Sequence, residues 1–133
     1  MDLKSLVLNT KSAWVDFPGL KGFSVEVVNL SKKELIALRK RCMGQKFDRK
    51  SRGVVESLDE DRFVKEFTAS TVKNWKGLTL ANLETLLLID MDGKNPEDEL
   101  EYTAANAEIL VSSSTEFDTW LNEVVFDLGN FRN

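Results

Sequence analysis

The chain contains no histidine and a single cysteine, Cys42. The lack of histidine excludes Ser-His-Asp catalysis, Cys-His catalysis and zinc sites built from imidazole ligands. One cysteine excludes an intramolecular disulfide and fits a reducing compartment. Cys42 falls on the apolar face of a predicted helix, which favours a small core residue. The alternative is an exposed thiol whose pKa is lowered by Arg39 and Arg41.

Long apolar runs and glycine-rich phosphate loops are also lacking. No stretch approaches the roughly 20 apolar residues that span a bilayer. The first residues, MDLKSLVLNTKSAW, have neither the apolar core nor the cleavage site of a signal peptide. Neither GxGxxG nor GxxxxGK[ST] occurs. We therefore expect a protein that is not an enzyme, has no cofactor and no metal, and does not enter a membrane.

Charge is distributed unevenly along the 133 residues. Residues 1–76 carry 16 basic and 10 acidic side chains, whereas residues 77–133 carry 2 basic and 12 acidic ones. This asymmetry indicates intramolecular attraction, or head-to-tail contacts between copies in a homo-oligomer. Two solvated faces of a monomer would have the same composition.

The sequence predicts a mainly α (α+β) fold, with one domain over residues 1–133 in which an N-terminal β-hairpin packs on about five amphipathic helices. The hairpin is predicted over residues 12–28, where Val25-Glu26-Val27 alternates and Pro18-Gly19 marks a turn. Because an isolated hairpin is marginally stable in water, its apolar face is expected to lie on the helices.

The central predicted helices span 60–76 and 80–89. Asp59 is a good N-cap for the first, and Phe63, Phe67, Thr71 and Trp75 recur every four residues. Gly77 can end this helix, and two helices joined by so short a connection must fold back or cross sharply. Further helices are predicted over 32–43, 104–112 and 115–128, and residues 45–57 are expected to form a loop or a short irregular strand.

Two charged segments are candidate sites. The loop at 90–103 spaces Asp90, Asp92, Asp98 and Glu101 as in a calcium-binding EF-hand, but Lys94 occupies a ligand position, which favours a solvated acidic loop. The other segment is a basic run that can bind nucleic acid phosphates, face solvent, or contact the acidic half of a neighbour: Arg39, Lys40, Arg41, Lys46, Arg49, Lys50 and Arg52.

Several segments in order, from about Trp14 to Phe131, resemble the tail assembly chaperones of long-tailed, siphovirus-type bacteriophages. They are Trp14-Val15-Asp16-Phe17-Pro18-Gly19, Phe23-Ser24-Val25-Glu26-Val27, Lys46-Phe47-Asp48-Arg49-Lys50, Leu58-Asp59-Glu60-Asp61-Arg62-Phe63, Trp75-Lys76-Gly77-Leu78-Thr79 with Asn82-Leu83, Asn106-Ala107 and Phe117-Asp118-Thr119-Trp120.

The resemblance implies a protein of the infected bacterium's cytoplasm that binds the tape measure protein, keeps it soluble and is absent from the mature virion. It also implies a longer product, made by ribosomal frameshifting, through which tail tube protein is recruited. A chaperone of amphipathic helices needs an exposed apolar surface. The partner-binding residues expected here are the Leu-rich run, with part of the last helix, and the basic run: Leu86, Leu87, Leu88, Ile89, Arg39, Arg41, Arg49, Lys50 and Arg52. The alternatives are simple burial of the leucines, a small nucleic-acid-binding or regulatory protein, and a structural tail completion protein.

Overall fold

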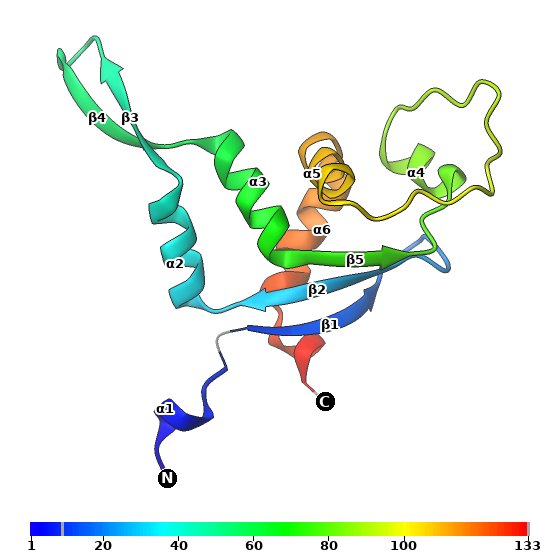
Figure 1. The fold of residues 1–133 in the computed structure, drawn as a ribbon, viewed down its shortest axis with the longest axis horizontal. Coiled ribbons are helices and arrows are strands. Elements are labelled where there is room, and N and C mark those ends of the chain that lie inside the picture. Colours follow the sequence, from blue (N-terminus) through cyan, green and yellow to red (C-terminus); the bar gives the residue numbers. More distant parts are fainter. Residues whose placement is uncertain (9, 133) are drawn as a thin grey trace.

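A three-stranded antiparallel sheet of order β1-β2-β5 organises the computed structural model, which describes residues 1–8 and 10–132 (Figure 1). The elements, in chain order, are α1 Leu3–Leu6, β1 Thr10–Asp16, β2 Ser24–Leu30, α2 Lys32–Arg41, β3 Met43–Asp48, β4 Gly53–Leu58, α3 Glu60–Thr71, β5 Val72–Lys76, α4 Leu80–Leu86, α5 Ala104–Ser113, α6 Thr115–Phe126 and the 3-10 helix η1 Leu128–Phe131. Helices α3 and α6 pack on β2, and α5 packs on both of these helices.

The fold is a single α+β domain, with 45% helix and 25% strand among the described residues. The predicted N-terminal hairpin is present as β1 and β2, which pair from Thr10↔Leu30 to Asp16↔Ser24. The mainly helical prediction is nevertheless wrong in proportion, because the described residues contain two small antiparallel sheets. The additional strands are β5, which completes the first sheet, and the separate pair β3 and β4.

Strand β5 replaces the last turn of the helix predicted over 60–76. Helix α3 ends at Thr71, and Val72 onward pairs with β2 through Val25↔Trp75 and Val27↔Val72. The register shifts between Glu26 and Val27, so Lys73 is an extra residue on β5. Such a bulge lets two residues three apart face the same side of a sheet, and both Val72 and Trp75 are buried. This i, i+3 spacing imitates a helix, which explains the wrong prediction.

The predicted fold-back of two adjacent helices is also absent, since β5 separates α3 from α4. Gly77 has φ +74° and directly follows β5, where its backbone lies against Gly22 of the β1–β2 turn. Beyond it, Thr79 caps α4 by accepting a hydrogen bond from the Asn82 amide at 3.1 Å. Strand β5 is therefore followed by a close backbone contact between Gly77 and Gly22, and then by the short helix α4.

An aromatic cluster fixes the β1–β2 turn onto α6. Phe17 lies 5.6 Å from Phe23 and 4.9 Å from Trp120 between ring centroids, and Phe117 is stacked 6.0 Å from Phe17. All four rings are buried. Asn29 adds a polar contact between sheet and helix, because its side-chain amide donates to the Val125 carbonyl at 2.7 Å. Phe17 of the hairpin turn and Trp120 of α6 thus meet in one core.

The remaining helices differ from prediction mainly at their ends. Helix α2 stops at Arg41 rather than 43, α4 at Leu86 rather than 89, and α6 at Phe126 rather than 128. Their N-caps are Ser31, Thr79 and Ser114, which accept hydrogen bonds from amides in the first turns of these helices. Helix α5 runs one residue beyond the predicted 112.

Residues 45–57, expected to be irregular, lie in a regular hairpin. Strands β3 and β4 pair from Met43↔Leu58 to Asp48↔Gly53 and project from the body between α2 and α3 (Figure 1). At the base, the Asp59 amide donates to the Cys42 carbonyl at 2.8 Å. At the turn, the Asp48 carboxylate accepts from the Lys50 amide at 3.0 Å, and Arg52 has φ +53°. We refer to residues 43–58 as the β3–β4 ribbon.

Candidate interaction surfaces

The helix predicted over 80–89 ends within the leucine run, which leaves α4 in an extended conformation at Leu87. Helix α4 ends at Leu86, and Leu87 has φ −140° and ψ 156°. Successive side chains of an extended segment point in opposite directions. Leu87 and Ile89 accordingly pack against the core, together with Leu86, whereas Leu88 is fully exposed, at 105%. Three of the four residues are therefore partly buried, and only Leu88 is exposed.

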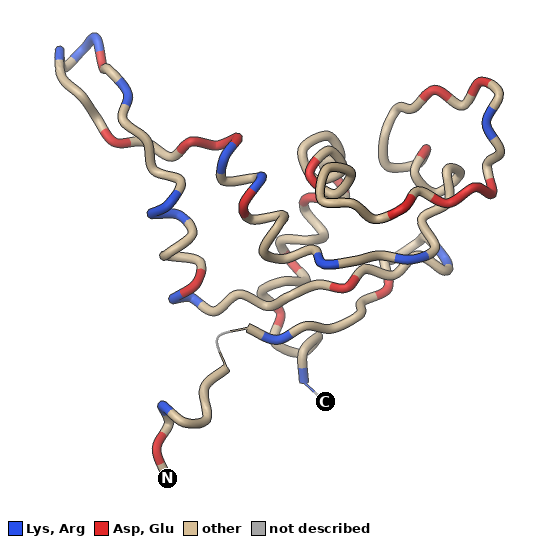
Figure 2. The backbone as a smooth tube through the Cα atoms, viewed as in Figure 1, with Lys and Arg blue, Asp and Glu red and all other residues tan. Residues whose placement is uncertain are grey.

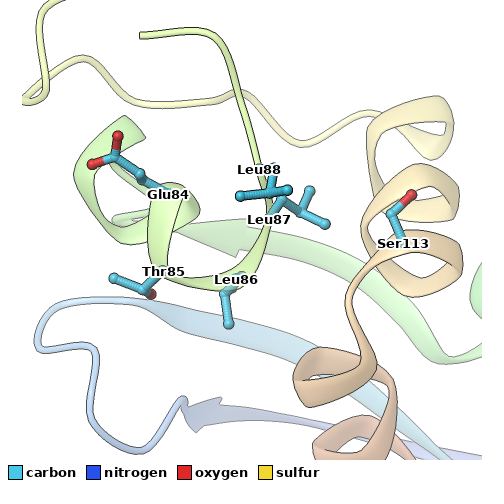
Figure 3. A pocket seen from close by; sticks show the side chains of 6 residues that line it. All are labelled: Glu84, Thr85, Leu86, Leu87, Leu88 and Ser113. Atoms are coloured by element: carbon cyan, nitrogen blue, oxygen red, sulfur yellow. The ribbon is translucent and has the colours of Figure 1, made fainter.

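Leu88 lies at a cavity of about 470 Å³, which is lined by Glu84, Thr85, Leu86, Leu87, Leu88 and Ser113 (Figure 3). Ser113, at the end of α5, faces this space from across the cavity, and Leu87 points toward α5. A residue of α5, and not of the last helix as expected, therefore completes the site. We call this cavity with Leu88 the Leu88 groove. Its lining combines the three leucines with the polar or acidic residues Glu84, Thr85 and Ser113.

The predicted basic run divides into two parts. Arg39, Lys40 and Arg41 occupy the last turn of α2, where cations are favoured by the helix dipole. The other four residues are Lys46 on β3 and, in the turn at the tip of the β3–β4 ribbon, Arg49, Lys50 and Arg52, all exposed (Figure 2). The two ion pairs among the described residues are Arg41–Glu66 at 3.7 Å and Arg62–Glu66 at 4.0 Å. The basic residues of the ribbon therefore have no ion-pair partner among the described residues.

The β3–β4 ribbon also presents apolar side chains that the sequence prediction missed. Phe47 pairs with Val54, so both lie on one face, and they are 64% and 63% exposed. Met43 and Leu58 share that face nearer the body. Within the described residues, β3 and β4 pair only with each other, so both outer edges offer free backbone groups. The alternation Lys46-Phe47-Asp48 and the turn residue Gly53 were the available sequence signals.

The acidic segment 90–103 is a surface loop, as predicted, but its second half is anchored. The Leu80 amide donates to the Asp98 carbonyl and the Leu100 amide to the Leu78 carbonyl, both at 2.8 Å. Trp75 Nε1 donates to the Leu100 carbonyl at 2.9 Å. Among residues 1–8 and 10–132, no group of three or more acidic or cysteine side chains is arranged to hold a metal ion.

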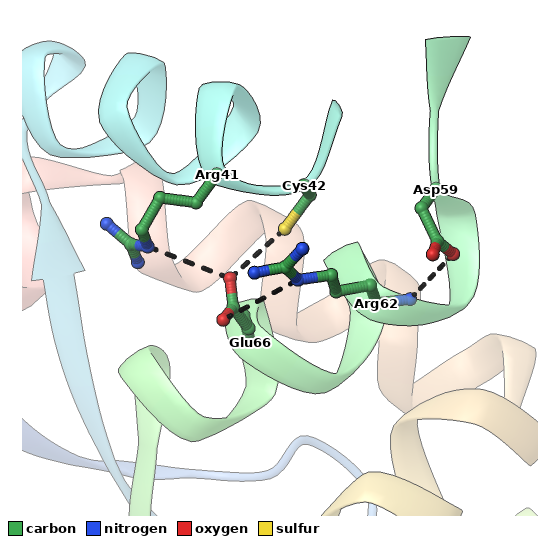
Figure 4. A network of polar contacts seen from close by, with 5 residues as sticks. All are labelled: Arg41, Cys42, Asp59, Arg62 and Glu66. Atoms are coloured by element: carbon green, nitrogen blue, oxygen red, sulfur yellow. Dashed lines mark hydrogen bonds and ion pairs between the residues drawn. The ribbon is translucent and has the colours of Figure 1, made fainter. Parts of the chain in front are cut away.

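Cys42 lies in the core, as the simpler interpretation predicted. Its thiol donates to Glu66 Oε2 at 3.2 Å, and Glu66 also meets Arg41 and Arg62 (Figure 4). Burial raises the pKa of the Cys42 thiol above its ordinary value of 9.0, and the bond to Glu66 raises it further. The nearby arginines lower it by less. The alternative of an activated thiol is therefore wrong.

The N-terminal segment is a second apolar surface that sequence reasoning missed. Leu3, Leu6, Val7 and Leu8 are all exposed, and α1 lies apart from the other helices (Figure 1). No helix in the described part of the chain has the length and apolar character needed to span a membrane.

Comparison with models of protein families, with curated proteins and with solved structures yielded no match to this chain.

Proposed function

We propose that this chain is a bacteriophage tail assembly chaperone that acts in the host bacterial cytoplasm. In this proposal it binds the tape measure protein, keeps it soluble and helps to recruit tail tube subunits through a longer frameshifted product. It does not enter the mature virion. It acts by binding and catalyses no reaction.

The Leu88 groove is the observation that carries this proposal. A tape measure protein of the implied kind is long and largely helical, so it presents apolar side chains at positions i, i+3, i+4 and i+7. The groove is lined by the partly buried Leu86 and Leu87 and by the fully exposed Leu88. The order of sequence segments that resembles the chaperone family supports the same function independently.

The expected affinity of one such contact is modest. Burying an exposed leucine side chain contributes about 1.5–3 kcal/mol, part of which is lost to ordering the two partners. A long client offers many similar segments, so many copies can bind one client, and copies linked to each other would hold it with a higher overall affinity than one copy does. Weak, repeated binding of this kind suits a chaperone that must later be displaced by tail tube protein.

Co-expression with a very long helical protein, sought among the products encoded just downstream, tests the proposal. We expect the chain to raise the soluble fraction of that protein severalfold. Leu88→Asp places a charge in the contact, and Ser113→Arg fills the groove from an exposed position of α5; both variants should lose the effect while remaining folded. Leu128→Asp, which alters an exposed leucine of η1, is the matched control and should keep it. If wild type does not rescue solubility, the proposal is wrong.

A second candidate function, nucleic acid binding, is favoured by the unpaired cations at the tip of the β3–β4 ribbon. Contacts to phosphates release counterions, so such binding weakens steeply with salt. Salt-dependent retention of the purified protein on DNA, lost in Arg49→Glu/Lys50→Glu, would support this candidate. Detection of the chain in purified phage particles would instead favour a structural tail completion protein.

A further inference from the structure

The β3–β4 ribbon is incomplete as it stands. A two-stranded ribbon is marginally stable alone, yet this one extends from the body with two unpaired edges. Its apolar pair, Phe47 and Val54, is exposed to water near the tip. The tip itself carries three exposed cations, Arg49, Lys50 and Arg52, without ion-pair partners among the described residues. A partner for this surface must be acidic and must also offer some apolar contact.

The acidic loop of the same protein has the complementary character. Six exposed carboxylates, against the single cation Lys94, occupy this loop: Asp90, Asp92, Glu97, Asp98, Glu99 and Glu101. Backbone hydrogen bonds hold the segment around Asp98 against the start of α4, so the carboxylates in the second half of the loop extend from an anchored backbone. Met91 and Pro96 provide apolar atoms between them.

The ribbon tip and the acidic loop lie at opposite ends of the molecule (Figure 2). One copy therefore cannot satisfy its own charges by folding the tip onto the loop. Two different surfaces that complement each other across copies make a heterologous contact, which propagates into a ring or an open chain.

We propose that the tip of the β3–β4 ribbon of one copy docks onto the acidic loop 90–101 of a second copy. Arg49, Lys50 and Arg52 meet the loop carboxylates, and Phe47 and Val54 contact its apolar atoms. The contact is electrostatic in large part, because the opposing segments carry several charges of opposite sign. It does not depend on the proposed function.

Complementary charge reversal tests this contact in the full chain. The ribbon variant is Arg49→Glu/Lys50→Glu and the loop variant is Glu97→Lys/Asp98→Lys; the side chains of all four residues are exposed. Lys32→Glu/Lys33→Glu is the matched control for the ribbon variant, because it makes the same change in net charge. These two lysines lie in the first turn of α2, at the end away from the ribbon. Sedimentation velocity over a concentration series measures association, and circular dichroism checks that each variant is folded.

We expect the wild type to self-associate, with an association constant that falls about tenfold between roughly 0.05 M and 0.5 M salt as screening increases. Each reversal variant alone should weaken association by about tenfold or more, because like charges then oppose each other. Mixing the two variants should restore association in alternating order, and the control should behave as wild type.

Three results would overturn the proposal. The first is a wild type that stays monomeric at low salt, and the second is a mixture of folded variants that stays monomeric while wild type associates. The third is a ribbon variant that loses nucleic acid binding while its sedimentation is unchanged, because the occupant of the ribbon is then nucleic acid. Failure of tape measure rescue in co-expression leaves all these results unaffected, so the two proposals fail separately.

Discussion

Replacing Gly77 by alanine is predicted to destabilise the fold far more than the same change at Gly93. Both residues have a left-handed backbone, with φ +74° and +71°. A Cβ atom at Gly77 would overlap the carbonyl oxygen of Gly22 and lie 2.7 Å from its carbonyl carbon, whereas a Cβ atom at Gly93 would have no atom within 4 Å. The pair of variants therefore separates backbone strain from the close contact between β5 and the β1–β2 turn.

The magnitude follows from these two terms. The left-handed conformation costs a non-glycine residue about 1–2 kcal/mol, and this cost is common to both variants. The overlap at Gly77 involves backbone atoms, so the β1–β2 turn must shift, which adds about 1–3 kcal/mol as in an overpacked core. The total for Gly77→Ala is about 2–5 kcal/mol, a large fraction of the roughly 5–15 kcal/mol that stabilises a typical domain.

Urea unfolding followed by tryptophan fluorescence measures both values. We expect Gly77→Ala to lower the unfolding free energy by about 1–3 kcal/mol more than Gly93→Ala does. Each alanine also lowers the conformational entropy of the unfolded chain by a similar amount, and this effect cancels in the difference between the two variants. Equal losses in the two variants would show that β5 does not approach the turn as described.

Two further predictions concern the buried thiol of Cys42 and the hydroxyl of the partly buried Tyr102. The pKa of the Cys42 thiol is raised in the folded state, so the unfolded chain releases this proton near pH 9.0 while the folded protein keeps it. The unfolded state is therefore favoured by deprotonation, and the folded state loses stability as the pH rises through this range. The unfolding free energy should therefore fall more steeply between about pH 8 and 10 in wild type than in Cys42→Ala; parallel curves would refute this. Tyr102 donates its hydroxyl to the Val72 carbonyl at 2.9 Å, and Tyr102→Phe should cost about 1 kcal/mol in urea unfolding while preserving the ring contact with Trp75. An unchanged midpoint would mean that this bond does not hold the loop to β5.

The sequence predicted those parts of the fold whose local signals agree with their surroundings. The β1–β2 hairpin and the N-cap Asp59 depend on turn and capping residues within a few positions of each other. Strand β5 was not predicted, because its pairing partner lies about 50 residues away and its bulge at Lys73 preserves a helix-like spacing. Long-range strand pairing outweighed the local helical pattern here.

The candidate surfaces were predicted by composition more than by geometry. The leucine run and the basic run were both identified, but the alternation that leaves Leu88 exposed depends on where α4 ends. Ser113, which lies opposite, is brought there by the packing of α5, and nothing in its own surroundings in the sequence indicates this. Phe47 and Val54 are neighbours only because of the β3–β4 pairing register. The sequence showed that residues 45–57 have no helical periodicity, but this did not reveal the register.

The central claim is that the Leu88 groove binds helical segments of a tape measure protein. Hydrogen–deuterium exchange of the chain, alone and in complex with a soluble tape measure fragment, tests this claim most directly. Residues 84–88 and the end of α5 around Ser113 should exchange more slowly in the complex, while Leu88→Asp should remove both the complex and this protection. Stable binding that leaves exchange at residues 84–88 unchanged would contradict the account.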